Sequence, residues 1–349
     1  MTLGVFLPSG LGELVMATPM LRALRKHFGP KTRLVGISPS RWGQLLEGTA
    51  WLDEQWHFAT QRENQQCRDW TLLRQMREAR FETLLLCSPS LHAHTLAWLS
   101  GAKERVGYAY PGGGRLLTKK LTWSANGRPA GYSKVDLYLR LAETVGCPAE
   151  PTALELGTLQ RDENSADELY RELGLPSDAS TVLLNPGASE GSAKLWPVER
   201  FAELARSIAN ELQIDVLVLS TSRSRQISGE IIRRAGNARV FSLADFALDL
   251  GTLKAVIRRG RVMVSGDDPI RFVAAAFGRP VISLFGPTCA EPKLPFVRSV
   301  NLASDVACRG CQNRVCPLKH QMCMKTISVE TVYGEVAKVL EESLAVCAA

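Results

Sequence analysis

A short turn near the start of the chain carries the first residue that could do chemistry. An apolar run at residues 3–7 leads into PSGLGE, where Gly10 and Gly12 come directly before the carboxylate of Glu13. Glycine lets a backbone turn tightly and approach a ligand closely. We expect a helix to follow, and the helix dipole favours a carboxylate in its first turn. Glu13 is therefore either a helix-stabilising charge or a general base that takes a proton from a hydroxyl group.

The same turn lacks the signatures of two common nucleotide-binding loops. A dinucleotide-binding fingerprint has a third glycine where this chain has Val15, and a phosphate-binding P-loop ends in Gly-Lys-Ser/Thr, which is missing here. We therefore disfavour a nicotinamide-dependent oxidoreductase.

A second loop, NPGASEGSAKLWP, follows a strand-like run at residues 181–185 and leads into a helix that we expect to begin at Pro197. Its small residues surround Ser189, Glu190 and Lys194. Backbone N–H groups in such a loop, together with a lysine ammonium, are suited to hold an anionic group. The alternative is a surface loop that is anchored by Trp196.

A third loop, SGDDP at residues 265–269, also follows a strand-like run. Asp268 and Pro269 suit the N-cap and the first position of a helix over residues 270–277. This local explanation accounts for the residues themselves. It does not explain why three polar loops recur at the ends of strands, so this loop is also a candidate ligand site.

Four of the nine cysteines form a cluster with the spacing C-x2-C-x4-C-x6-C, namely Cys308, Cys311, Cys316 and Cys323. Four thiols so close together could hold Zn²⁺ or an iron–sulfur cluster. A zinc ribbon has two C-x2-C knuckles and this chain has only one, so we favour redox-sensitive or packed thiols and expect no metal. A metal site is the alternative.

These loops require a scaffold that brings strand ends together. Strand-like runs alternate with amphipathic segments, a pattern typical of parallel sheets covered by helices. The runs are residues 3–7, 33–37, 83–87, 181–185, 215–220, 261–264 and 281–285. We predict an α/β protein with two doubly wound, Rossmann-like domains that face a central cleft, in which ligands bind beyond the carboxyl ends of the strands. The domains are residues 1–150 and 181–327, with a linker at 151–180 and a C-terminal helix at 328–349.

The composition fits a globular protein. Of the 349 residues, 45% are hydrophobic and 22% are charged, and the net charge is +7. No secretory signal or bilayer-spanning run is visible, so we expect a soluble, cytoplasmic protein. The excess of basic residues indicates a solvated surface or, alternatively, attraction to phosphate-bearing substrates or an anionic membrane face. No nucleic-acid recognition pattern is present, so we expect no nucleic-acid partner.

Taken together, the motifs resemble those of the bacterial lipopolysaccharide heptosyltransferases, glycosyltransferase family 9, and are most similar to the heptosyltransferase II branch. The stretches that carry the resemblance are PSGLGELVMATPMLRALRKHF, RVGYAYPGGGRLLT, NPGASEGSAKLWPVERFAELA, SGDDPIRFVAAAFGRPVISLFGPT and CRGCQNRVCPLKHQMCM. They occur in the family order and extend over nearly the whole chain.

The resemblance implies a two-domain GT-B fold and an inverting glycosyltransferase. Such an enzyme moves a heptose or a related sugar from an ADP-sugar to a lipopolysaccharide inner-core or related saccharide. The acceptor would bind to the N-terminal domain and the nucleotide sugar to the C-terminal domain, with no cofactor and no protein-bound metal. A lipid-linked acceptor implies a cytoplasmic protein in peripheral contact with the inner membrane.

The resemblance also assigns roles by position. Glu13 matches the family's catalytic base, which is usually an aspartate, and Lys194 matches the lysine that contacts the donor phosphates. Ser189 and Glu190 fall where small hydroxylated residues often face the donor. The implied donor site is completed by Asp267, Asp268 and Arg271, and the implied acceptor site contains Ser9, Gly10, Arg105 and Arg115.

The third loop departs from the family pattern. The family usually has Asp-Ser/Thr-Gly and then a histidine, whereas this chain has Asp268, Pro269 and Phe272 after Asp267. Pro269 has no N–H group to offer a phosphate, and Asp268 places negative charge near the expected diphosphate. Arg271 would compensate for that charge. The alternative function is a non-catalytic GT-B relative that binds a saccharide or a partner.

Overall fold

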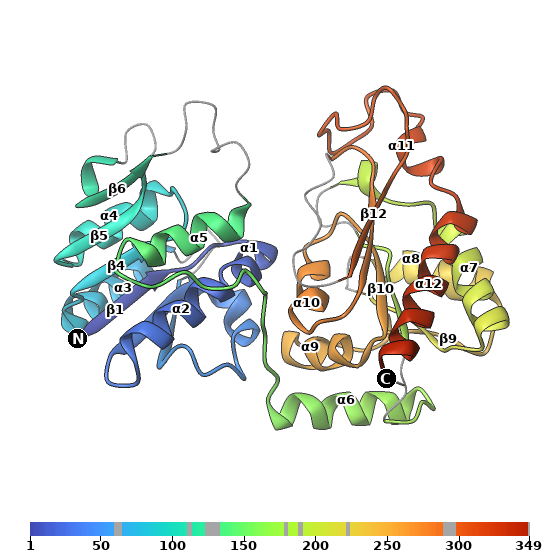
Figure 1. The fold of residues 1–349 in the computed structure, drawn as a ribbon, viewed down its shortest axis with the longest axis horizontal. Coiled ribbons are helices and arrows are strands. Elements are labelled where there is room, and N and C mark those ends of the chain that lie inside the picture. The colour runs from blue at the N-terminus through green and yellow to red at the C-terminus, as the bar shows by residue number, and fades with distance from the viewer. Residues whose placement is uncertain are drawn as a thin grey trace. The chain divides into compact units, whose positions relative to one another are not determined.

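The computed structural model of the chain describes residues 1–58, 65–109, 114–122, 133–177, 181–187, 191–220, 224–288 and 298–347, with the backbone alone at residues 65–69 and 343–347. The chain divides into two compact units, Met1–Gly157 and Thr158–Ala349. Within the described residues, each unit contains one six-stranded sheet with helices packed against it (Figure 1). Every strand pairing is parallel. The predicted α/β class with two doubly wound domains is confirmed.

The sheet of unit 1 has the strand order β3-β2-β1-β4-β5-β6. Its strands are β1 (Thr2–Phe6), β2 (Arg33–Pro39), β3 (Glu54–Phe58), β4 (Thr83–Leu86), β5 (Glu104–Ala109) and β6 (Lys119–Thr122). Its helices are α1 (Leu11–Met16), α2 (Thr18–Phe28), α3 (Gln65–Ala79), α4 (Leu91–Leu99) and α5 (Lys134–Glu143), with short 3₁₀ helices η1 (Ser40–Leu45) and η3 (Gly114–Leu116). Apolar side chains of α3 and α4 pack with those of β2 and β4 in one buried cluster, and α2 packs against α5.

The sheet of unit 2 has the strand order β12-β11-β10-β7-β8-β9. Its strands are β7 (Val182–Asn185), β8 (Val216–Val218), β9 (Val240–Ser242), β10 (Val262–Gly266), β11 (Val281–Phe285) and β12 (Ser299–Ala303). Its helices are α6 (Gln160–Glu172), α7 (Val198–Ser207), α8 (Arg225–Ala235), α9 (Leu250–Arg259), α10 (Ile270–Ala276), α11 (Met322–Lys325) and α12 (Val329–Cys347), with η4 (Ser192–Lys194) and the π-helical turn η5 (Ile208–Leu212). The buried cluster of this unit joins its strands to α7 and α12.

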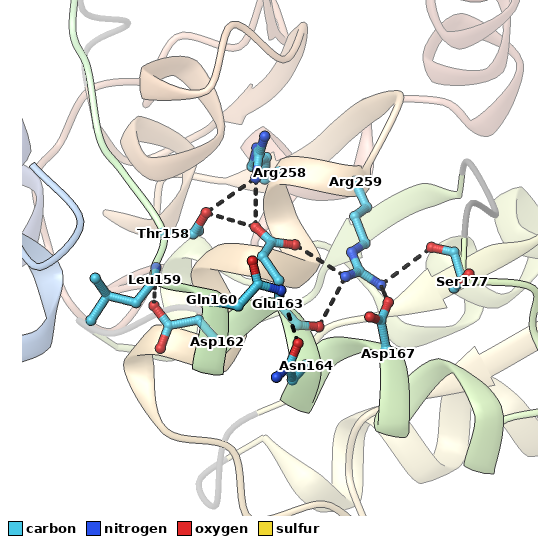
Figure 2. A network of polar contacts seen from close by, with 10 residues as sticks. All are labelled: Thr158, Leu159, Gln160, Asp162, Glu163, Asn164, Asp167, Ser177, Arg258 and Arg259. Carbon is cyan, nitrogen blue, oxygen red and sulfur yellow. Dashed lines mark hydrogen bonds and ion pairs between the residues drawn. The ribbon is translucent and has the colours of Figure 1, made fainter.

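The boundary between the two units, after residue 157, lies inside the linker predicted over residues 151–180, and the residues of that linker are divided between the two units. Gly157 packs so closely on Gly48 that a Cβ atom at Gly157 would collide with the Gly48 carbonyl oxygen, so residues up to 157 belong to unit 1. Helix α6 belongs to unit 2 because Glu163 binds two arginines of α9 (Figure 2). Its carboxylate oxygens lie 2.6 Å from Arg258 Nη1 and 3.0 Å from Arg259 Nη2.

The remaining predicted boundary concerns the C-terminal helix. Helix α12 begins at Val329, one residue after the predicted start, and packs against α7 within unit 2. In the part of the chain that the structure describes, no helix has the length and apolar character needed to cross a membrane.

Candidate functional site

The turn after β1 places Glu13 in the first turn of α1, as predicted. Gly10 is the N-cap residue of this helix and has an extended backbone, with no side chain to cap the helix. The carbonyl oxygen of Ser9 accepts hydrogen bonds from Arg41 Nη2 at 3.0 Å and from Trp42 Nε1 at 2.8 Å. The 3₁₀ helix η1 therefore fixes the turn that carries Glu13.

Glu13 forms an ion pair with Lys134, the first residue of α5. The start of α5 is fixed by a reciprocal capping box between Ser133 and Asp136. The side chains of Glu13 and Lys134 are 35% and 27% exposed, so a substrate can reach the carboxylate while the ammonium orients it. Sequence reasoning missed Lys134, although the capping-box sequence SKVD marks the start of its helix.

The four residues implied for the acceptor site do not all lie near Glu13. Ser9 and Gly10 belong to the same turn. The strand register places Arg105 level with Gly4 inside the sheet, whereas Glu13 follows the carboxyl end of β1. The Arg105 guanidinium donates from Nε to the Leu116 carbonyl oxygen at 2.8 Å, which braces the β5–β6 edge. Arg115 is exposed on η3, and the roles of these four residues remain predictions.

In unit 2, the structure brings together three of the residues predicted for the donor site. Lys194 ends η4, and its Nζ atom lies 2.8 Å from Oδ2 of Asp267, the residue that follows β10. Arg271, on α10, approaches the other carboxylate oxygen at 3.4 Å. The side chains of Lys194, Asp267 and Arg271 are 13%, 19% and 3% exposed. One partly buried carboxylate therefore lies between two cations.

The electrostatics of this cluster favour the ionised carboxylate. Burial alone would raise the pKa of Asp267, but the hydrogen bond and charge of Lys194, with the charge of Arg271, outweigh burial and lower it. The Arg271 guanidinium lies 4.3 Å from the ring centre of Phe272 and 5.3 Å from that of Phe285. These aromatic faces stabilise a cation that is almost fully buried.

Asp268 serves mainly the start of α10. Its Oδ1 atom accepts a hydrogen bond from the Ile270 N–H at 3.0 Å, and the helix begins at Ile270 with Pro269 as its N-cap residue. The cap therefore lies one residue later than predicted, although Asp268 still satisfies a free N–H of the first turn.

A side-chain hydrogen bond joins the ends of β7 and β10, the two central strands of the sheet, close in sequence to Asp267. Asn185 ends β7, and its Nδ2 atom donates to Ser265 Oγ of β10 at 2.9 Å. The backbone N–H of Gly187 donates to Asn185 Oδ1 at 3.4 Å, which starts the turn toward Lys194. Sequence reasoning named neither Asn185 nor Ser265 as a site residue, although each is a polar residue at the end of an apolar run.

The last two predictions concern Ser189 and Glu190 in the donor site and the cluster of four cysteines. Ser189 and Glu190 lie within residues 188–190, outside the described part of the chain. The four clustered cysteines are free thiols that line one cavity. Among the residues that the structure describes, no group of three or more His, Cys, Asp or Glu side chains is arranged to hold a metal ion.

Comparison with known proteins shows which family shares these features. Residues 70–322 match the sequence profile of glycosyltransferase family 9 (heptosyltransferase). Lipooligosaccharide heptosyltransferase 2 of Campylobacter jejuni subsp. jejuni serotype O:6 is 26% identical over 348 residues, which cover 97% of this chain and 99% of that protein.

Solved structures share the fold. The structure of E. coli ADP-heptose lps heptosyltransferase II superposes with a TM-score of 0.79 at 20% identity, covering 98% of this chain and 99% of that one. A family 9 glycosyl transferase from Veillonella parvula gives a TM-score of 0.83 at 18% identity, covering 98% and 97%. With a profile match over more than half of its length, the chain belongs to glycosyltransferase family 9, the heptosyltransferase family.

Proposed function

We propose that this chain is an inverting heptosyltransferase that moves a heptose from ADP-heptose to an inner-core saccharide of lipopolysaccharide or lipooligosaccharide. The observation that carries the proposal is the full-length similarity to a lipooligosaccharide heptosyltransferase 2. The carboxylate of Glu13 and the ammonium of Lys194 supply the two groups that this chemistry requires.

Lys194 would bind the diphosphate of the donor. Negative charge develops on the leaving ADP as the bond between its phosphate oxygen and the anomeric carbon breaks, and a nearby ammonium stabilises that charge. Lys194 now pairs with Asp267, so a diphosphate must share or displace this contact. Arg271 remains on Asp267 when Lys194 turns to the phosphates, so the buried carboxylate keeps a cationic partner.

Glu13 would act as the general base. It removes the proton of an acceptor hydroxyl, the oxygen attacks the anomeric carbon from the side opposite the diphosphate, and the configuration inverts as ADP leaves. The proton then passes from Glu13 to solvent. Lys134 holds the carboxylate in place through their ion pair, and such positioning lowers the barrier because the reacting groups are already aligned.

The acceptor would bring the protein to a membrane. A lipid-linked saccharide places the reaction at the cytoplasmic face of the inner membrane. The net charge of +7 and the exposed cations Arg115, Lys119 and Lys120 of unit 1 support attraction to anionic lipid.

The test is transfer of one heptose from ADP-heptose to purified inner-core acceptors, followed by the mass of the product and by release of ADP. We expect transfer by the wild type, loss of transfer in Glu13→Gln, and retention in Glu78→Gln, which changes an exposed carboxylate on α3. ADP binding without heptose transfer would contradict the proposed sugar or acceptor.

The alternative makes a different prediction. A non-catalytic relative that binds only a saccharide or a partner would bind no nucleotide, and calorimetry with ADP, GDP and UDP would show this. Each of the relatives named above is described as a transferase, so none of them supports the alternative.

A further inference from the structure

The segment between β12 and α12 gathers four thiols around one small cavity. Cys308, Cys311, Cys316 and Cys323 line this cavity, together with Ala193 and Pro287. Its volume is about 30 Å³, which is the space of one or two water-sized spheres. The four cysteines are free, so no disulfide bond joins them. Four cysteines from different positions in the sequence therefore surround a cavity that has room for one metal ion.

The backbone of this segment adopts conformations that L-residues rarely use. Five non-glycine residues in the described part of the chain have positive φ, and three of them lie here: Gln312 (58°), Lys319 (58°) and Gln321 (52°). Each such residue costs about 1 kcal/mol or more and persists only where its surroundings enforce it. Gln312 directly follows Cys311, and the other two follow Cys316, so the unusual backbone is next to the thiols.

One consequence of these turns is a set of N–H groups directed at Cys316. Backbone hydrogen bonds reach the Cys316 sulfur from Gln321 and from residues 318–320. Hydrogen bonds from backbone N–H groups to sulfur stabilise thiolates at metal centres and tune them. The local fold therefore directs backbone N–H groups at one of the four sulfur atoms.

The closeness of the four sulfur atoms also favours a bound cation. Four thiolates around one cavity would repel each other strongly. A metal ion at the centre would remove this repulsion and replace the lost thiol protons.

We propose that Cys308, Cys311, Cys316 and Cys323 form a tetrathiolate site for one transition-metal ion, either Zn²⁺ or iron. Both are ions that four soft thiolates select. Binding releases the thiol protons to solvent and forms four metal–sulfur bonds, with no change in the oxidation state of sulfur. No three ligands in the described part of the chain already have metal-binding geometry, so the sulfur atoms must converge on binding, as the exposed turn around Cys311 permits.

The position of the site gives it a structural role toward η4, a role that rests on the proposed function. The N–H of Ala193 donates to the Arg314 carbonyl oxygen at 3.1 Å, and Gln321 Nε2 donates to the Ser192 carbonyl oxygen at 3.0 Å. Gly191 lies against Arg314 so closely that a Cβ atom would collide with its carbonyl oxygen. A metal that fixes the thiols would therefore fix the loop that carries Lys194.

The metal is tested independently of activity. We expect elemental analysis of the full chain, purified anaerobically without a metal-affinity tag, to find about one equivalent of zinc or iron, and the element found identifies the ion. The double variant C308S/C311S should lose it, and Cys147→Ser, which changes a buried thiol outside the cluster, should retain it. A wild type that stays metal-free after reconstitution with Zn²⁺ or Fe²⁺ would overturn the site, as would a double variant that keeps its metal.

A second readout uses the wild type alone and does not depend on the variants folding. Alkylation followed by mass spectrometry should find the four thiols protected in the metal-loaded protein and reactive after chelation. Equal reactivity in both states, or disulfide bonds among the four, would contradict the site. If the metal is present and its removal leaves ADP affinity unchanged, the proposed effect on the loop of Lys194 is refuted while the metal site stands.

Discussion

The ammonium of Lys194 and the carboxylate of Asp267, 2.8 Å apart, join the loop after β7 to the loop after β10 in unit 2. Both side chains are largely buried, and Arg271 contacts the same carboxylate from α10. These three side chains together carry one net positive charge, which the carboxylate of the adjacent Asp268 offsets. A donor diphosphate would therefore have to share the Lys194 ammonium with Asp267 or displace it from that carboxylate.

Replacing Lys194 with alanine should weaken ADP binding about tenfold or more, because a charge-assisted contact is lost and Asp267 is left facing the phosphates. Isothermal titration calorimetry with ADP measures the effect. Lys338→Ala, which removes an exposed lysine from α12, is the matched control and should bind like the wild type. Equal affinities in the two variants would remove Lys194 from the donor site.

Replacing Asp267 with asparagine should have the opposite effect. The change preserves the shape of the side chain, removes the competing carboxylate from Lys194 and raises the net charge of the cluster. We expect tighter ADP binding at low salt and a smaller gain at high salt, because screening weakens the added attraction. Weaker binding would show that Asp267 itself contacts the donor.

Replacing Glu13 with glutamine should lower kcat by about 10²–10⁴ and leave ADP affinity unchanged, because a general base acts only in the chemical step. Glu13→Asp should retain part of the activity, since a shift of about 1 Å can cost about a hundredfold. Lys134→Met should lower kcat less than Glu13→Gln, because Lys134 positions the carboxylate and transfers no proton in the reaction. A single-turnover assay compares the three, and full activity in Glu13→Gln would exclude the base.

Replacing Glu163 with glutamine should destabilise unit 2 near neutral pH by about 2 kcal/mol, because Arg258 and Arg259 lose their shared partner. Burial raises the pKa of Glu163, but hydrogen bonds from Thr158 and both arginines outweigh it, so the folded-state pKa is lowered.

The lowered pKa of Glu163 determines how its contribution to stability depends on pH. The contribution of Glu163 is fully present above its usual pKa of 4.5 and is lost as the pH falls through the lower folded-state value. Urea unfolding at several pH values should therefore show wild type and Glu163→Gln converging in acid. Glu168→Gln, exposed on the same helix, should change little at any pH, and a constant difference between wild type and Glu163→Gln would contradict this account.

Replacing Trp196 with alanine should lower the free energy of unfolding by about 3–5 kcal/mol. Its ring is 2% exposed, packs edge-on against Phe201 at 4.9 Å, and donates a hydrogen bond from Nε1 to the Ile327 carbonyl oxygen at 3.0 Å. Trp98→Ala is the control, because that ring is 53% exposed on α4. A small effect at position 196 would show that the surroundings collapse into the cavity.

The sequence predicted the interior of each sheet and missed its edges. The seven predicted runs correspond to β1, β2, β4, β7, β8, β10 and β11, which are buried and therefore appear as continuous apolar stretches. The edge strands β3, β6, β9 and β12 are partly exposed and mix polar with apolar residues, as in KKLT of β6. The interior strand β5 was missed because it begins with Glu104 and Arg105.

The same contrast holds for the candidate sites. Local patterns placed Glu13 in a helical first turn and Asp267 after a strand, because each depends on adjacent residues. The ion pair of Glu13 with Lys134 joins residues 121 positions apart, and no local pattern encodes that contact. Arg105 was assigned through the family resemblance, whereas its guanidinium donates hydrogen bonds to carbonyl groups of the backbone.

The close contact that Gly191 makes with Arg314, which only a residue without a Cβ atom allows, has a consequence for protein engineering. Because the loop that ends at Lys194 rests directly on the backbone of Arg314, it is not an exchangeable module. A chimera that takes this loop from a relative would also have to take residues 304–324. We expect the two segments to change together among natural variants, because a substitution in one limits the substitutions that the other tolerates.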